Sequence, residues 1–157
     1  MLFLCFNSNN PFPFRVLLFG LLEIINMINI PRQSHGKRVQ TAACDLKTGQ
    51  VTELDLSFSM LYGTPHSNNS LFSLHHLQKL VLSYNDFNFS NISSQFGQFS
   101  NLMHLNLTHS GFAGQVPLEI FHLSKLVSLD ISNKHLSLET ISFDKIVQNL
   151  TKLRVLT

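Results

Sequence analysis

The chain has 157 residues and carries 11 Lys and Arg against 9 Asp and Glu, which gives a formal net charge of +2. This length suits one domain, and so small a charge gives no reason to expect a nucleic-acid or anionic-membrane partner. The two cysteines are Cys5 and Cys44. Removal of a leader that contains Cys5 would leave Cys44 as an odd thiol.

The first apolar run, residues 16–22, has the composition of a signal-peptide core. Arg15 precedes it, but Glu23 follows it and no clear small-residue cleavage site is present. The run is too short to span a bilayer. The sequence therefore leaves open whether this segment is a cleaved leader, and it predicts no transmembrane helix.

From residue 51 onward the sequence repeats itself. The repeated pattern is L-x-x-L-x-L, and its copies begin at Val51, Leu77, Leu102, Leu126 and, as a partial copy, Leu153. The starting points are 24 to 27 residues apart, within the ~20–29 residues of a leucine-rich repeat. We therefore expect a solenoid in which each repeat buries its leucines against its neighbours.

The alternation within L-x-L has the period of a β-strand, so two apolar side chains point inward and the residue between them points outward. The predicted inward pairs are Leu54/Leu56, Leu80/Leu82, Leu105/Leu107 and Leu129/Ile131. A second apolar set on the return path consists of Leu71/Leu74, Phe96/Phe99, Ile120/Leu123 and Ile146/Leu150. Amphipathic helices are disfavoured, because turn residues recur at matched offsets after each strand. The predicted fold is an α/β-type solenoid: a leucine-rich repeat horseshoe segment with short parallel strands on the concave face and irregular or 3-10 return segments.

One position three residues after each strand motif is suited to a ladder of side-chain hydrogen bonds. Asn85 fits it well, because an amide there can bond neighbouring backbone groups. Ser59 and Ser110 are weaker versions, and Lys134 cannot accept a hydrogen bond. We therefore expect a looser turn in the fourth repeat.

The outward side chains of the strands and the turns that follow them form the candidate recognition surface, which mixes aromatic and charged groups as binding surfaces often do. Its predicted ligand-binding residues are Glu53, Asp55, Phe58, Lys79, Val81, Tyr84, His104, Asn106, His109, Ser128, Asp130 and Asn133. The alternative, that these early repeats are scaffold and make no ligand contact, stays open at this point.

Five N-x-[ST] sequons lie in the repeats, at Asn68, Asn88, Asn91, Asn106 and Asn149. They favour a secreted, N-glycosylated surface over a merely polar repeat composition. A glycan on Asn106 would stand on the concave sheet and block ligand contact.

The sequence offers no chemistry of catalysis or metal binding. Its nearest histidine groups, His75 with His76 and His104 with His109, lack the spacing of zinc ligands. No phosphate-binding loop, Ser-His-Asp set or pair of catalytic carboxylates is evident. We therefore expect neither enzymatic activity nor a cofactor nor a metal.

The third repeat reads LMHLNLTHSGFAGQVPLEIFHLSK and resembles the plant extracellular leucine-rich repeat, of which the Gly114…Pro117 part is typical. Residues 44–156, and above all CDLKTGQVTELDLSFSMLYGT, resemble the N-terminal part of plant disease-resistance receptor-like proteins of the Cladosporium-resistance type. The resemblance implies a plasma-membrane glycoprotein with a signal peptide, a cysteine-paired cap, a long repeat array, one transmembrane helix and no kinase.

The same resemblance suggests an origin for the segment before Cys44. The family's cap resembles S-W-K-E-G-T-D-C-C, and its back-translated codons read one base late encode residues 35–43 of this chain. We therefore interpret residues 1–43 as an N-terminal apolar segment and a degenerate, out-of-frame cap, residues 44–50 as a cap remnant, and residues 51–157 as repeats. The repeats are 51–76, 77–101, 102–125, 126–152 and a partial 153–157. Without a complete cap, Leu54 and Leu56 should be exposed at one end of the array, and Leu153 and Leu156 at the other.

The predicted function is a non-enzymatic extracellular recognition module, a truncated plant defence receptor-like protein that binds protein or peptide ligands through its repeat surface. The resemblance implies a receptor kinase as a further partner, and a location in the secretory pathway, at the plasma membrane or outside the cell. Membrane attachment would require an N-terminal anchor or parts missing from this chain. Two alternatives are a small secreted decoy resembling polygalacturonase inhibitors and a non-functional gene fragment.

Overall fold

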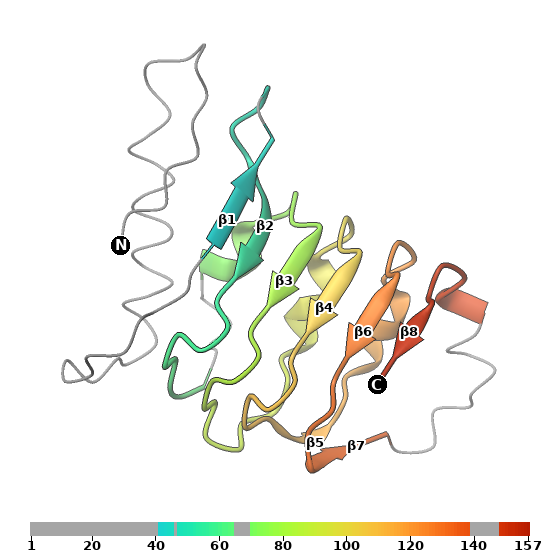
Figure 1. Cartoon of the computed structure of the whole chain (residues 1–157). Coiled ribbons are helices and arrows are strands. Elements are labelled where there is room, and N and C mark those ends of the chain that lie inside the picture. Colours follow the sequence, from blue (N-terminus) through green and yellow to red (C-terminus); the bar gives the residue numbers. More distant parts are fainter. Residues whose placement is uncertain (1–40, 46, 65–69, 139–147) are drawn as a thin grey trace.

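A computed structural model describes residues 41–45, 47–64, 70–138 and 148–157. Six strands form one sheet in the order β1-β2-β3-β4-β6-β8 (Figure 1). Their bounds are Thr41–Cys44 for β1, Val51–Asp55 for β2, Lys79–Val81 for β3, His104–Asn106 for β4, Ser128–Asp130 for β6 and Val155–Leu156 for β8. From β2 to β8 each strand comes from the next repeat and is parallel to its neighbour. The predicted solenoid of short parallel strands is therefore confirmed.

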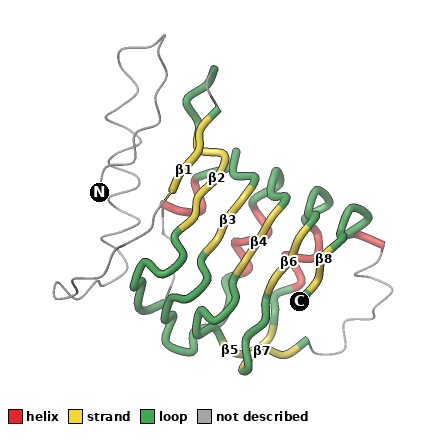
Figure 2. The backbone as a smooth tube through the Cα atoms, viewed as in Figure 1, coloured by secondary structure: helices red, strands yellow, loops and turns green. Residues whose placement is uncertain are grey.

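The return paths of the repeats run behind this sheet and contain 3-10 turns (Figure 2). These are η1 (Ser70–Ser73), η2 (Ser94–Gln98) and η3 (Leu118–His122). A second, two-stranded parallel sheet joins β5 (Ala113–Gln115) to β7 (His135–Ser137). Short 3-10 turns fit here because each repeat must reverse within a few residues, where a longer helix would widen the convex side.

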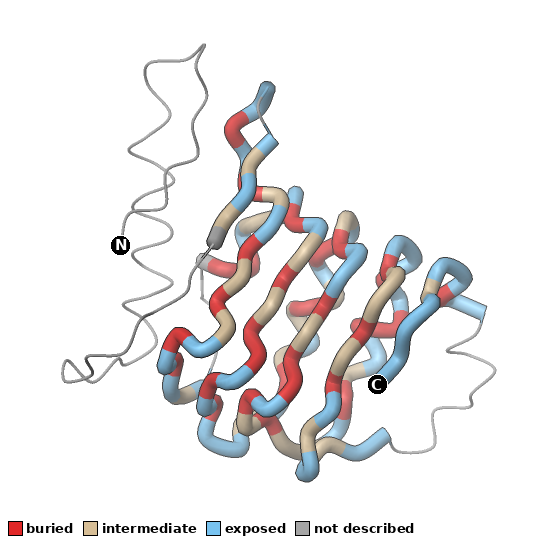
Figure 3. The backbone as a smooth tube through the Cα atoms, in the orientation of Figure 1, coloured by how far each residue is buried: buried red, intermediate tan, exposed pale blue. Residues whose placement is uncertain are grey.

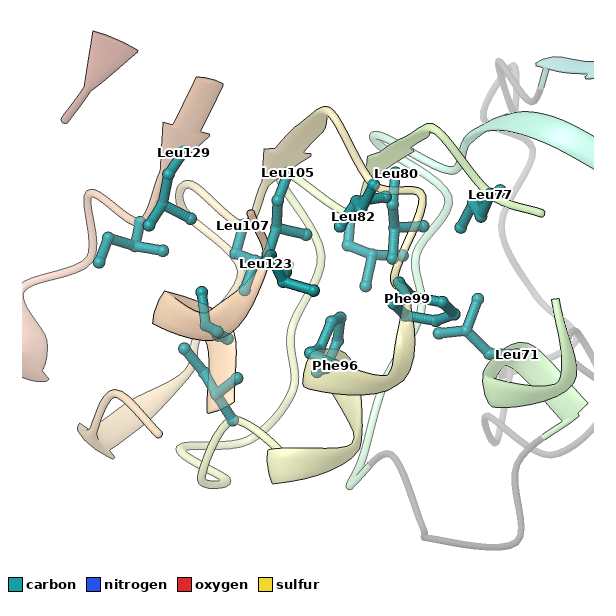
Figure 4. Close-up of a cluster of buried hydrophobic side chains, with 14 of the residues drawn as sticks. Leu71, Leu77, Leu80, Leu82, Phe96, Phe99, Leu105, Leu107, Leu123 and Leu129 are labelled. Carbon is teal, nitrogen blue, oxygen red and sulfur yellow. The ribbon is translucent and has the colours of Figure 1, made fainter. Parts of the chain in front are cut away.

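The core lies between the large sheet and the return segments, and along β3, β4 and β6 a buried leucine lies between two less buried residues (Figure 3). All eight of the predicted inward residues from Leu54 to Ile131 are buried. On the convex side Phe96 and Phe99 face the strand leucines (Figure 4), and their rings pack edge to face with centroids 6.1 Å apart. Leu74 is half-buried, and Ile146 lies outside the described residues.

Adjacent return segments pack most closely where η2 meets η3. A Cβ atom added to Gly97 would lie 2.5 Å from the Cβ of Glu119 and 2.9 Å from its carbonyl oxygen. Any larger side chain would therefore push the two repeats apart. Gly97 is in this way a determinant of the repeat spacing on the convex side.

The first repeat is covered on its N-terminal side, contrary to the expectation from sequence. β1 pairs with β2 antiparallel, from Thr41 opposite Asp55 to Cys44 opposite Val51. Ala42 and Cys44 pack against the core, and Leu54 and Leu56 are fully buried. The prediction that these leucines would be exposed was wrong, because the residues just before Cys44 provide a covering strand. β1 also crosses the boundary between residues 43 and 44 that was drawn from the resemblance.

A tight turn connects β1 to β2 and is held by one carboxylate. Asp45 accepts hydrogen bonds from the backbone and hydroxyl of Thr48 and from the backbone of Lys47. These bonds, led by the one from the Thr48 backbone, lower the pKa of the Asp45 carboxyl. Cys44, directly before this turn, is disulfide-bonded and is not an odd thiol in the structure.

The last described strand has an exposed face. In β8 the side chains of Val155 and Leu156 are 48% and 38% exposed, and Leu153 is half-buried. The expected exposure of apolar residues at this end is therefore present at Leu156 and only partial at Leu153.

Candidate ligand-binding face

Parallel pairing places the outward side chains of the strands in two straight rows across the sheet. The first row contains Glu53, Lys79, His104 and Ser128, and the second contains Asp55, Val81, Asn106 and Asp130. All eight are among the predicted ligand-binding residues. A hollow of about 390 Å³ runs over β2 to β8 and is lined by seven of them. A smaller hollow of about 200 Å³ between β1 and β3 adds Asp55.

The charges on this face are unbalanced. Lys79 lies 4.0 Å from a carboxylate oxygen of Glu53, and both side chains are about half exposed. No other ion pair joins residues in the described part of the chain. Asp55 and Asp130 therefore add negative charge to the face, and neither is paired with a described cation.

The carboxylates and the amide of the second row are held in fixed positions by the residues that follow each strand. One oxygen of Asp55 accepts from the backbone and hydroxyl of Ser57 at 2.9 and 2.7 Å. Asn106 is bonded in the same way by Thr108, and Asp130 by Ser132. No role for these Ser and Thr residues was predicted from the sequence, although their recurrence after each L-x-L motif was the available signal.

Three aromatic rings form a continuous stack beyond the strand ends. The rings of Phe58 and Tyr84 lie 4.3 Å apart at 9°, and those of Tyr84 and His109 lie 4.9 Å apart at 3°. All three residues have left-handed backbone conformations, with φ of 51°, 56° and 50°. Each follows a strand end by three residues, so the stack borders the concave sheet and is not part of its strands. All three side chains are exposed.

A ladder of buried polar side chains lies directly behind this aromatic stack. The amide oxygen of Asn85 accepts from the backbone nitrogens of Ser59 and Leu61, and its nitrogen donates to the carbonyls of Leu56 and Leu82. The hydroxyl of Ser110 reaches Leu82 O and two carbonyls of its own repeat. These bonds join successive repeats and fix the turn on which each ring of the stack is placed.

Asn133 is part of this ladder, not of the predicted ligand-binding surface. Its side chain is partly buried, accepts from the backbone of Ser110 at 3.0 Å and donates to Leu107 O at 2.7 Å. The sequence alignment had assigned the ladder position of this repeat to Lys134, which is exposed. A lysine cannot accept a hydrogen bond, so the residue before it takes the place. The turn of the fourth repeat is therefore held by side-chain hydrogen bonds and is not the looser turn that was expected.

The sequons are distributed over different surfaces. Asn88, Asn91 and Asn149 are exposed, Asn106 is half-buried in the centre of the concave sheet, and Asn68 lies outside the described residues. On Asn106 the oxygen is bonded by Thr108 of its own sequon. Its nitrogen, the atom that would carry a glycan, makes no hydrogen bond to any residue that the structure describes.

Exposed apolar side chains also lie in the turn after β2, a feature that was not predicted from the sequence. Met60 and Tyr62 are 40% and 45% exposed, next to Phe58. The signal available in the sequence was the alternation of apolar and small residues after the first strand. Within ranges 41–45, 47–64, 70–138 and 148–157, no group of three or more His, Cys, Asp or Glu is placed to hold a metal ion, and no helix has the length and hydropathy to cross a membrane.

The register of the strands, the asparagine ladder and the repeated return segments define a leucine-rich-repeat solenoid. No protein-family model matches the chain. It is 54% identical over 114 residues to the Receptor-like protein Cf-9 homolog of Solanum lycopersicum, a match that covers 72% of this chain and 14% of that protein. The matched part of the chain therefore belongs to the plant receptor-like proteins of the Cladosporium-resistance type. The chain spans 9–14% of the length of the curated relatives that it matches first.

Solved structures show the same fold. The leucine-rich-repeat ectodomain of the plant membrane receptor kinase GASSHO1/SCHENGEN3 from Arabidopsis thaliana, in complex with CASPARIAN STRIP INTEGRITY FACTOR 2, matches 88% of this chain and 17% of that chain with a TM-score of 0.69 at 21% identity. The BIR3–SERK2 complex from the same organism matches 88% of this chain and 78% of that chain with a TM-score of 0.66 at 24% identity. At such identities the likeness concerns the fold alone.

Proposed function

We propose that this chain forms part of the ectodomain of a plant defence receptor-like protein and acts as a non-enzymatic module that binds a protein or peptide outside the cell. The observation that carries the proposal is the pair of in-register rows of outward side chains over a hollow of about 390 Å³. This sheet face is not covered by any element that the structure describes. It is lined by polar, charged and apolar groups and bordered by exposed rings, which is the composition of a recognition surface.

Two kinds of partner are consistent with this proposal. One solved neighbour is in complex with CASPARIAN STRIP INTEGRITY FACTOR 2, and another contains two proteins, BIR3 and SERK2. By analogy we assign to this chain a protein or peptide ligand and a receptor kinase partner. The exposed sequons at Asn88, Asn91 and Asn149 support placement in the secretory pathway, with the plasma membrane or the extracellular space as its end point.

The test is selection of peptides from a displayed random library on the purified full chain. Enriched peptides should bind the unmodified chain and lose at least tenfold in affinity on Val81→Arg, which places a long cation in the centre of the concave face. Gln98→Arg is the matched control, because Gln98 is exposed on η2, away from that face. Enriched peptides that bind the two variants equally well would overturn the assignment of the concave face.

A further inference from the structure

The second row of the concave sheet ends on two carboxylates, and neither forms an ion pair with a cation among the residues that the structure describes. Asp55 and Asp130 stand at equivalent places in β2 and β6. Each uses one oxygen to bond the following serine. The second oxygen of each makes no hydrogen bond or ion pair with another residue that the structure describes. Both carboxylates are thus fixed in orientation, and each has one oxygen that no described residue bonds.

The surroundings of these two groups favour a cationic ligand. Among the described residues, Lys79 is the only lysine or arginine that lines the two hollows, and Glu53 already pairs with it. The two neighbouring hollows are therefore lined by three carboxylates and one lysine, and Asp55 and Asp130 are the carboxylates without a described ion-pair partner. Charge complementarity of this kind selects partners and accelerates their association.

The spacing of the two carboxylates sets the geometry of the ligand. Three strand-to-strand steps separate β2 from β6, which corresponds to about 14 Å at about 4.8 Å per step. An extended peptide that crosses the strands advances about 3.4 Å per residue, so residues i and i+4 are also about 14 Å apart and project to the same side. Between the carboxylates the row contains Val81 and Asn106, which are neutral and half-buried. They suit a small uncharged side chain at i+2.

We propose that the concave face binds an extended peptide that crosses β2 to β6, with basic side chains at i and i+4 on Asp55 and Asp130 and a small neutral residue between them. This inference rests on the proposed recognition function and names the chemical class of its ligand. The unused amide nitrogen of Asn106 adds a hydrogen-bond donor for a peptide carbonyl in the middle of the site.

The probe is the blocked heptapeptide Gly-Arg-Gly-Ala-Gly-Arg-Gly, with its arginines at i and i+4, measured by calorimetry on the full chain from a bacterial host that leaves Asn106 unmodified. A peptide of the same composition with arginines at i and i+3 should bind about fivefold more weakly, because one arginine then points away from the sheet. A peptide with glutamates in place of arginines should not bind. Binding should weaken as salt rises, since exposed charges are screened.

The variants Asp55→Asn and Asp130→Asn should each weaken binding of the arginine peptide about three- to fivefold, as expected for an ion pair at the protein surface. Asp86→Asn is the matched control. The side-chain oxygen of Asp86, like those of Asp55 and Asp130, accepts a hydrogen bond from a backbone nitrogen two residues later. Asp86 is exposed and lines neither hollow of the concave face. Urea unfolding of all three variants checks that each is folded.

Equal binding of the two arginine peptides, or binding that neither aspartate variant changes, would overturn the basic-peptide assignment. If library-selected peptides of another composition still lose affinity on Val81→Arg, the recognition function stands and only the ligand class is wrong. If no peptide responds to Val81→Arg, both the ligand class and the proposed function fail.

Discussion

The amide oxygen of Asn133 lies 3.0 Å from the backbone nitrogen of Ser110, one repeat earlier in the chain. Asn85 makes the same contact to the backbone nitrogen of Ser59 at 3.2 Å. The two asparagines do not occupy the same position of the repeat, since Asn133 comes two residues after Ile131 and Asn85 comes three after Leu82. The ladder of side-chain hydrogen bonds therefore continues into the fourth repeat through an asparagine that stands one position earlier in the repeat than Asn85 does.

Replacement of Asn85 should be among the most destabilising single changes in the repeats. Asn85→Ala removes the partners of two buried backbone donors and of the Leu56 and Leu82 carbonyls. Buried groups left without partners cost about 1–3 kcal/mol each, with partial relief by water, so we expect a loss of about 3 kcal/mol in the free energy of unfolding. Urea unfolding measures it. Asn101→Ala, at a more exposed amide, should cost under about 1 kcal/mol, and equal losses for the two variants would contradict the ladder.

In the fourth repeat Asn133, and not Lys134, should contribute to the free energy of unfolding. Asn133→Ala leaves Ser110 N and Leu107 O without their side-chain partners and should cost about 1–2 kcal/mol. Lys134→Ala changes an exposed side chain and should stay within about 0.5 kcal/mol. Urea unfolding curves of the two variants measure both changes. A larger loss of unfolding free energy for Lys134→Ala would show that Lys134 occupies the ladder position, as expected from the sequence.

Gly97 should tolerate no side chain. Gly97→Ala brings a methyl group to 2.5 Å from Glu119 Cβ and should lower the free energy of unfolding by about 2 kcal/mol, as overpacking does. Gly49→Ala is a useful comparison, because Gly49 has φ of +70° but no atom within 4 Å of the added Cβ. Its cost should be limited to backbone strain of about 1 kcal/mol. A thermal melt in which Gly97→Ala equals the unmodified chain would refute the close packing of η2 on η3.

The aromatic stack should show energetic coupling between its members. A left-handed backbone conformation destabilises a non-glycine residue by roughly 1–2 kcal/mol, and a stacked ring pair stabilises the fold by about 0.5–1.5 kcal/mol. A double-mutant cycle of Phe58→Ala and Tyr84→Ala should give a coupling of about 1 kcal/mol. The pair Phe58→Ala and Phe89→Ala, whose rings make no contact with each other, provides the control. A coupling near zero in the first cycle would mean that the stack contributes nothing to stability.

A glycan on Asn106 should compete with any ligand of the concave face. Chain secreted from a eukaryotic host should show occupancy of this sequon by mass spectrometry before and after glycosidase treatment. If the site is occupied, the peptide Gly-Arg-Gly-Ala-Gly-Arg-Gly should bind that material at least tenfold more weakly than the bacterial chain. Asn88→Gln, which removes an exposed sequon that lines neither hollow, should leave the peptide affinity of secreted chain unchanged. Equal affinity of occupied and unmodified chain would show that the glycan lies clear of the sheet.

The sequence by itself determined the fold and its inner surface. Leucines at L-x-L spacing can be buried only by strands whose neighbours repeat the pattern, so Leu80, Leu105 and Leu129 had one consistent arrangement. The outward rows followed from the same alternation, which is why Glu53 and Asp130 were placed correctly on the sheet face.

Only the tertiary structure decided the positions that depend on contacts between repeats. Neither propensity nor periodicity indicates that Asn133 reaches back to Ser110, because that bond depends on the path of the previous turn. The stacking of Tyr84 on Phe58 and His109 likewise depends on left-handed turns that the buried ladder fixes. The strand Thr41–Cys44 covers Leu54 although its own sequence has no repeat pattern. An antiparallel partner needs only free backbone groups at a sheet edge, and these are supplied by the fold and not by side-chain spacing.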